Sequence, residues 1–404
     1  MLLKMNLVQT TGFAVIFMLI GRLIRNKVSF FTRYSIPAPV IGGILFSLIH
    51  LATKTAGLLE IEFTTTLQSF FQTMYFSTIG LSASLKILKK GGSVVFKFLL
   101  IAVFMSLMQN VIAVGISWLV GFNPMLGLLC GSSALVGGTG TTAAVAPSVE
   151  ALGYPEALTV GITAATFGIL TGSITGNPIA RRLIIKQNLY KAGDQDPFQD
   201  TELSVEEEAK PLTKNSVSMA VFTLLVIMFF GSYVTEFINT MVGKVVDNIA
   251  FPAYLGTMLI ASIYRNVADN NPKVKLDMEA MDTVASFSLS IFLGIALLNL
   301  KLWQLFTMAL PMILILTMQL VFAFLYASYF VHPVMGKNYD SAMMASGLIG
   351  FGMGSTSNAM ANMQALSEQY RYSKMAFFVV PIVGALFIDF INIFLIFGFI
   401  GFLS

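Results

Sequence analysis

The sequence predicts an all-α polytopic membrane protein with two inverted-topology repeats, each of five transmembrane helices and one re-entrant glycine-rich hairpin. Hydrophobic residues make up 56% of the 404 residues and charged residues only 11%, whereas soluble domains carry roughly 25% charged residues. Many hydrophobic runs have the length of about 20 residues that a transmembrane helix needs. Two segments rich in glycine, serine and threonine interrupt these runs at matching places in the two halves.

The expected spans fall into two sets of five. They lie near residues 7–24, 36–53, 66–86, 94–120 and 157–180, and near 216–238, 249–264, 280–299, 304–330 and 374–403. We therefore divide the chain into an N-terminal repeat (1–185), a polar linker (186–214) and a C-terminal repeat (215–404). The linker is acidic and is interpreted as a solvated connector, with a regulatory docking segment as the alternative.

The two glycine-rich segments lie at about 122–155 and 337–372, and each is too short and too broken to cross the bilayer twice. We interpret each as a re-entrant hairpin that enters and leaves on the same side. Glycine-broken backbone at membrane depth must be packed in protein or line a polar cavity. Matching interruptions in two halves point to the binding site of a transporter.

The distribution of basic residues supports this count of spans. With the N-terminus outside, 20 of the 24 Lys and Arg residues fall on the cytoplasmic side, as the positive-inside rule requires. Only Lys4, Lys54, Lys244 and Lys301 are expected outside. Because five is an odd number, the two halves have opposite orientations, both termini are outside and the linker is cytoplasmic.

Short sequence similarities between the two halves indicate a duplication. The pairs that recur in order are Leu85-Lys86 with Leu300-Lys301, Met108-Gln109 with Met318-Gln319, and Ala151-Leu152 with Ala365-Leu366. Gln109 and Gln319 lie in long apolar spans, where we expect them to form hydrogen bonds between helices. Inverted repeats of this kind place the substrate and the coupling ions near the membrane midplane.

The polar groups of the two glycine loops predict a binding site for a small solute. A hairpin tip offers backbone N–H groups, and a helix that begins there adds a partial positive charge suited to a carboxylate. The alternative is that the small residues only let helices pack closely. The expected substrate-binding residues are Gly137, Gly138, Thr139, Gly140, Thr141, Gly352, Gly354, Ser355, Thr356 and Asn358.

Side chains with oxygen atoms near the loops are candidates for binding a monovalent cation. Asp389 lies deep in the last span, where an ionisable group costs several kcal/mol unless it is compensated. A structural hydrogen-bonded carboxylate is the alternative for Asp389, and a polar helix face is the alternative for Asn362. Asn177 is either a polar site residue or a helix-end cap. The expected cation ligands are Thr142, Asn362, Asp389 and Asn392.

Enzymatic and ATP-driven functions lack their signatures. The sequence has no His-Glu-x-x-His motif, no Walker loop and no paired intramembrane aspartates. The net charge of +4 is modest, and no nucleic-acid partner is expected. The sequence therefore predicts transport driven by an ion gradient or by the solute's own gradient. A channel or a membrane-embedded enzyme is the alternative from another class.

Several motifs, in order along the chain, resemble those of the bacterial sodium/glutamate symporters. In the first half they are Ile36-Pro37-Ala38-Pro39, Ser77-Thr78-Ile79-Gly80-Leu81 and Gly137-Gly138-Thr139-Gly140-Thr141. In the second half they are Met335-Gly336-Lys337-Asn338-Tyr339-Asp340, Gly350-Phe351-Gly352-Met353-Gly354, Ala361-Asn362-Met363-Gln364-Ala365, Met375-Ala376-Phe377 and Phe387-Ile388-Asp389. The similarity runs from about residue 10 to 395 and fails in the linker.

The resemblance implies sodium-coupled import of L-glutamate by elevator-type alternating access, with Na⁺ as the co-transported ion. It also implies a homodimer in the lipid bilayer of the bacterial cytoplasmic (inner) membrane. The sequence departs from the family pattern at two places, namely at Thr139, where we expect His, and at Ser357-Asn358, where we expect Pro-Thr. Both lie at the expected site. They leave a close dicarboxylic amino acid, or another organic anion on the same scaffold, as alternative cargo.

Overall fold

The computed structural model describes residues 2–33, 36–55, 60–189, 212–242, 251–271, 274 and 276–404, so most of the expected linker lies outside the described residues. The elements of the first half are β1 (Leu2–Met5), α1 (Leu7–Lys27), α2 (Ser29–Arg33), α3 (Ala38–Thr55), β2 (Glu60–Phe63), α4 (Thr66–Ser82), α5 (Leu85–Lys90), α6 (Gly92–Leu119), α7 (Pro124–Leu128), α8 (Ser132–Leu135), α9 (Gly138–Ala151) and α10 (Ala157–Lys186).

The second half has only helical elements within the described residues. Its elements are α11 (Lys214–Val242), α12 (Ala253–Asn270), α13 (Met278–Leu298), the 3₁₀ helix η1 (Leu302–Thr307), α14 (Ala309–Tyr326), the π-helical turn η2 (Ala327–Val331), α15 (His332–Val334), α16 (Tyr339–Gly352), α17 (Thr356–Gln369), α18 (Lys374–Pro381), the π-helical turn η3 (Ile382–Phe387) and α19 (Ile388–Leu403).

Short polar side chains set the starting points of several helices. Asn6 caps α1, Asn123 caps α7, Asn338 caps α16, Ser355 caps α17 and Ser373 caps α18, each accepting a hydrogen bond from a backbone N–H of the first turn. These N–H groups have no partner within the helix, so a side-chain oxygen there stabilises the helix by about 1 kcal/mol. The Ser355 cap starts α17 directly after the second glycine loop.

Eight helices of the described residues are long and apolar enough to cross a membrane. They are Leu7–Lys27, Ala38–Thr55, Gly92–Leu119, Ala157–Lys186, Lys214–Val242, Met278–Leu298, Ala309–Val334 and Lys374–Leu403. Each falls on one of the ten expected spans, and the chain is therefore a multi-pass membrane protein. The other two expected spans, near 66–86 and 249–264, are occupied by α4 and α12, which are not among the eight.

The last span is not the uninterrupted α-helix that its hydrophobicity indicates. After Pro381 the backbone forms η3, in which the N–H of Ile388 bonds to the carbonyl of Val383. Proline has no N–H and its ring displaces the preceding carbonyl groups, which accounts for a local widening of the helix at this point. The π-helical turn ends at Phe387, two residues before Asp389, the acidic residue that the sequence marks out in this span.

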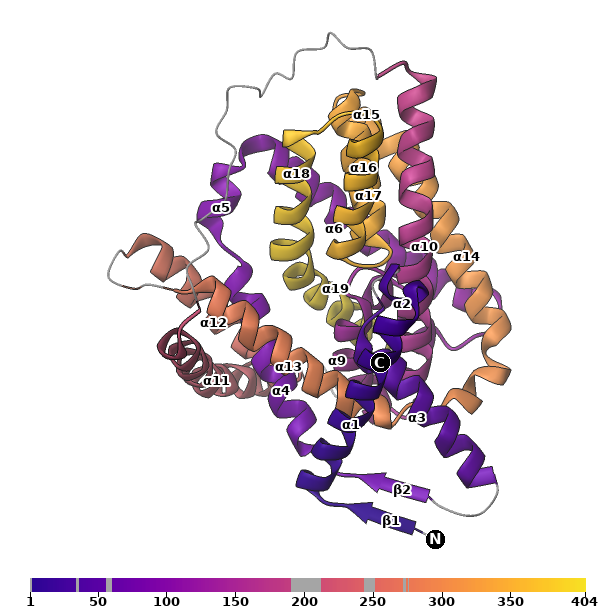
Figure 1. The fold of residues 1–404 in the computed structure, drawn as a ribbon, viewed down its shortest axis with the longest axis vertical. Helices are drawn as coiled ribbons and strands as arrows, with labels where there is room; N and C mark the ends of the chain where they lie inside the picture. The colour runs from indigo at the N-terminus through magenta and orange to yellow at the C-terminus, as the bar shows by residue number, and fades with distance from the viewer. Residues whose placement is uncertain are drawn as a thin grey trace.

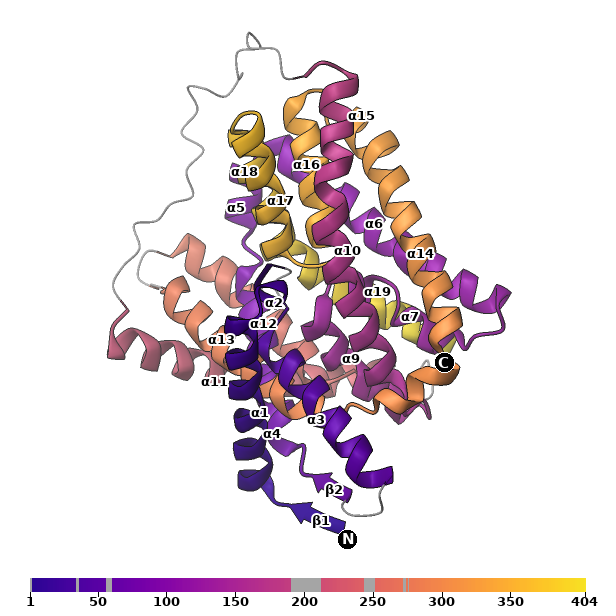
Figure 2. The same cartoon turned by 45° about the vertical axis from the view of Figure 1, so that its right-hand side comes forward.

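The two halves contact each other crosswise. α4 packs against α12, and α13 packs against α3, while α1 lies on α3 and α11 lies on α12 within each half. In Figures 1 and 2 these helices form the lower part of the molecule, and α10, α14, α16, α17 and α18 rise above them. The parallel strands β1 and β2 pair at the base, next to the N-terminus.

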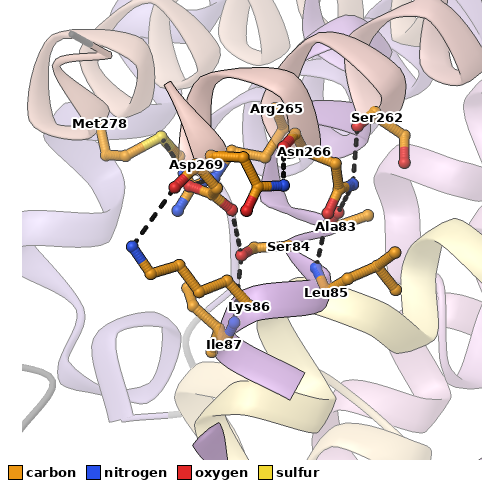
Figure 3. Close-up of polar contacts among 11 residues, drawn as sticks. Ala83, Ser84, Leu85, Lys86, Ile87, Ser262, Arg265, Asn266, Asp269 and Met278 are labelled. Carbon is orange, nitrogen blue, oxygen red and sulfur yellow. Dashed lines mark hydrogen bonds and ion pairs between the residues drawn. The ribbon is translucent and has the colours of Figure 1, made fainter. Parts of the chain in front are cut away.

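A polar cluster fixes the turn between α4 and α5 to α12 (Figure 3). Ser84 donates to the carboxylate of Asp269, and Asn266 holds both the N–H of Leu85 (2.8 Å) and the carbonyl of Ala83 (2.9 Å). The connection that leads from α4 towards α6 is therefore attached to the lower group of helices.

Candidate functional site

The second glycine loop is a tight turn between α16 and α17. Ser355 donates its N–H to the carbonyl of Gly350 (3.0 Å), and its Oγ accepts from the N–H of Asn358 (3.2 Å). A Cβ atom added at Gly350 would lie 2.3 Å from the Cα of Ala359. The two helices of this segment thus touch backbone to backbone, which only glycine permits.

The first glycine loop joins α8 to α9. Gly138 opens α9 with a φ of +62°, a left-handed conformation that side chains rarely adopt. The side chain of Thr141 occupies the space beside Gly137. Thr139 and Thr141 are both buried, so this loop lies inside the protein.

The structure brings the two loops together. A Cβ atom placed on Gly138 would lie 3.4 Å from the carbonyl oxygen of Gly354. The N-terminal ends of α9 and α17 therefore lie side by side, although Gly138 and Gly354 are far apart in the sequence. Each end presents backbone N–H groups without helical partners and a partial positive charge. Two such ends in one place can hold a carboxylate without any Lys or Arg.

The other expected substrate residues point in several directions from this meeting point. Gly140 faces α4, because a Cβ atom added at Gly140 would lie 3.7 Å from the ring of Tyr75. Thr356 donates to the carbonyl of Gly384 in η3 (2.9 Å), and Asn358 donates to the carbonyl of Ile169 in α10 (2.9 Å). The hydroxyl of Thr356 and the side-chain amide of Asn358 thus attach α17 to η3 and to α10.

Two of the expected cation ligands lie at one buried polar cluster. Asn392 of α19 donates to the carbonyl of Ser132 (3.0 Å), and Thr142 donates to the carbonyl of Ser133 (3.1 Å). Asn110 of α6 accepts both the N–H and the hydroxyl of Ser132, each at 2.9 Å. Within the described residues, Oδ1 of Asn392, Oγ of Ser133 and Nδ2 of Asn110 are buried without a hydrogen-bond partner. Free oxygen atoms of this kind suit a hard cation.

The other two expected cation ligands lie elsewhere. Asn362 donates to the carbonyl of Gly172 in α10 (3.0 Å). Asp389 lies close enough to Tyr75 of α4 for an electrostatic interaction, and within the described part of the chain no hydrogen bond or ion pair is found for its carboxyl group. The four expected cation ligands therefore do not form a single binding site in this structure.

The sequence interpretation missed the glycine face of α10. Gly168 and Gly172 lie against the backbone of Met353, and Gly176 lies against Asn362 and the carbonyl of Ser346. Glycines spaced four residues apart line one side of a helix and let a neighbouring helix approach closely. The spacing could therefore have predicted this contact from the sequence. Asn110, Ser132 and Ser133 were also missed, and only the three-dimensional structure joins them to Asn392.

The hydrogen bonds between helices that we expected of the repeated glutamines are confirmed. Gln109 donates to the carbonyl of Gly352 in the second loop (2.7 Å), and Gln319 donates to the backbone carbonyl of Gln109 (2.6 Å). Asn177 faces α16, where Ser346 donates to its Oδ1 at 3.5 Å. Both glutamines thus stabilise the surroundings of the loops.

Comparison of the sequence with known proteins shows the family of the chain. A family model described as "Sodium/glutamate symporter" matches residues 3–372. The sodium/glutamate symporter of Escherichia coli (strain K12) is 36% identical over 380 residues, which cover 94% of this chain and 93% of the relative. That of Haemophilus influenzae (strain ATCC 51907 / DSM 11121 / KW20 / Rd) is 33% identical over 387 residues, covering 95% and 94%. The chain belongs to the sodium/glutamate symporter family. This family consists of transporters rather than enzymes.

Proposed function

We propose that the chain is a sodium-coupled secondary active symporter that imports L-glutamate, or a close dicarboxylic amino acid, by alternating access. Membership of the sodium/glutamate symporter family supports the cargo and Na⁺ as the coupling ion. The observation that carries the proposal is the meeting of the two glycine loops, because the adjoining ends of α9 and α17 offer N–H groups to a carboxylate.

The ions act at separate places in this proposal. One cation binds at the cluster of Ser133, Thr142 and Asn392, where Oγ of Ser133 and Oδ1 of Asn392 have no hydrogen-bond partner within the described residues. Asp389 binds or supports a second cation, and Asn362 remains a candidate ligand on the second hairpin. The inside-negative potential opposes entry of an anion by about 2.3 kcal/mol per charge at 100 mV. Transport of more than one Na⁺ per substrate makes the net charge positive and turns that field into a driving force.

The proposed architecture extends the eight apolar helices to ten spans. In it, α4 and α12 also cross the membrane, and residues 1–185 and 215–404 are inverted repeats with re-entrant hairpins near 122–155 and 337–372. The crosswise packing of α4 on α12 and of α13 on α3 supports a two-fold relation between the repeats. The protein is proposed to be a homodimer of the elevator type in the bacterial cytoplasmic membrane, with both termini outside.

This topology can be tested with enzyme fusions. Alkaline phosphatase forms its disulfides only in an oxidising compartment outside the cytoplasm. We expect an active fusion after Lys301 and an inactive one after Lys191, with equal amounts of both fusion proteins verified by immunoblotting. Activity after Lys191, or its absence after Lys301, would contradict the ten-span topology.

The function is tested by uptake into proteoliposomes. We expect labelled L-glutamate to accumulate when a Na⁺ gradient points inward, and not when K⁺ replaces Na⁺, because only Na⁺ supplies the driving force. Unlabelled amino and dicarboxylic acids added in competition then rank the cargo. Uptake that is indifferent to the Na⁺ gradient would overturn the proposal, and unsaturable current without counterflow would indicate a channel.

The same competition experiment tests for a different cargo, because both glycine loops contain residues that differ from the family pattern. Thr139 is buried beside the loop contact, and Ser357 is exposed one residue before Asn358. If another organic anion competes more strongly than L-glutamate, the alternative of a different anion on the same scaffold is correct.

A further inference from the structure

A polar pocket of about 440 Å³ lies beside the first hairpin, between α4, α9, α13 and the start of α10. Its size falls within the range of roughly 300–1,000 Å³ that small-molecule sites occupy. Its walls carry the amides of Gln68, Gln72 and Asn299 and the hydroxyl of Ser69. We call this cavity the outer pocket. The cation and loop sites described above do not include it.

Two opposite charges line the outer pocket. Glu150 stands at the C-terminal end of α9, and Lys301 follows α13. Burial raises the pKa of Glu150, and the charge of Lys301 and the N–H of Leu158 partly oppose that shift. Lys301 is therefore close enough to Glu150 for their charges to attract each other. They are the two lining residues that carry a full charge.

This pair of charges is complementary to an amino acid with an extra acidic group. A carboxylate can pair with Lys301, the ammonium group can pair with Glu150, and the wall amides can donate to the second carboxylate. A dicarboxylate without an ammonium group leaves Glu150 facing negative charge. Like charges held this close repel each other and weaken binding.

The outer pocket and the first glycine loop lie along the same seam between α4 and α9. Gln72 lines the pocket and donates to the carbonyl of Ala144 in α9 (3.1 Å). One turn further along α4, Tyr75 lies against Gly140 at the start of α9. Gln72 and Tyr75 thus separate the pocket from the loops, and both lie on the same seam between α4 and α9.

We propose that the outer pocket is a loading site, where an acidic amino acid binds between Lys301 and Glu150 before it passes Gln72 and Tyr75 to reach the loops. The inference rests on the proposed function and on Lys301 lying outside. It adds to that function a separate first binding site, at which acidic amino acids are selected over dicarboxylates that lack the amino group.

The test is the kinetics of uptake by Lys301→Gln and Glu150→Gln in proteoliposomes. Lys301 is exposed, and exposed ion pairs are weak, so we expect Lys301→Gln to raise KM for L-glutamate roughly threefold to fivefold with kcat unchanged. Glu150 is more buried, so Glu150→Gln is expected to raise KM about tenfold. Competition by glutarate, which is glutamate without its amino group, should become stronger in Glu150→Gln.

Lys4→Gln is the matched control, because Lys4 is also expected outside but pairs with Glu62 at the base of the molecule (2.9 Å). It should leave KM unchanged. An unchanged KM in both pocket variants, a fall in kcat alone, or an unchanged response to glutarate would overturn the loading site. Each variant is compared with the wild-type protein. If the wild-type protein itself fails to take up glutamate with Na⁺, the proposed function is overturned instead of the loading site.

Discussion

Asp389→Asn is expected to weaken activation of uptake by Na⁺ between about tenfold and a hundredfold. Interactions with a charged group are worth about 1.5–3 kcal/mol, and each 1.4 kcal/mol changes an affinity about tenfold. Asp389 is partly exposed, lies in the first turn of α19 just after the π-helical turn η3, and has no hydrogen bond or ion pair within the described residues. A carboxylate placed in this way has its charge available for a cation.

The measurement is the Na⁺ concentration that gives half-maximal glutamate uptake in proteoliposomes with equal amounts of protein. Thr53→Ala is the control, because the hydroxyl of Thr53 donates to the nearby carbonyl of His50 at the end of α3 (3.0 Å). Unchanged Na⁺ activation in Asp389→Asn would remove Asp389 from the ion site. A variant that no longer accumulates in the membrane would support the structural alternative.

Gly350→Ala is expected to abolish uptake and to destabilise the protein by about 3 kcal/mol, the upper end of the usual cost of overpacking. The added Cβ would lie 2.3 Å from the Cα and 2.5 Å from the N of Ala359. These are backbone atoms of α17, so no side-chain rotation can relieve the clash. Separation of α16 from α17 would displace the second loop from Gly138.

Thermal unfolding in detergent and uptake should both reveal this effect. The matched control is Gly115→Ala in α6, where an added Cβ meets nothing within 4 Å. Because alanine favours a helix by about 1 kcal/mol over glycine, Gly115→Ala should be neutral or slightly stabilising. Equal unfolding temperatures for the two variants would contradict the close contact between α16 and α17.

Several features of the site could be predicted because they depend on local composition. The glycine loops are visible as interruptions of apolar sequence, and Gly138 and Gly354 indeed lie next to each other. The roles of Gln109 and Gln319 followed from their place in long apolar spans, where an amide must find a partner in another helix. The eight apolar helices also matched hydrophobic runs closely.

Other features depend on contacts between distant segments. The polar cluster joins Asn110, Ser132 and Asn392 from three helices, and no sequence spacing indicates that they meet. Pro381 was visible, but the conversion of the next turn into η3 depends on how the last span packs. The outer pocket requires α4, α9 and α13 to converge, which only the assembled chain shows.

The glycine face of α10 has a mechanical consequence. Backbone atoms of α10 and α16 touch at Gly168 and Gly172, and the amides of Asn358 and Asn362 are bonded to α10 carbonyl groups. Sliding of one helix along the other would break these bonds and drive backbone into backbone. α10, α16 and α17 therefore form one tightly packed unit. For the alternating access proposed above, we expect this unit to move as a single block and the seam between α4 and α9, where side chains meet instead of backbone, to be the surface that yields.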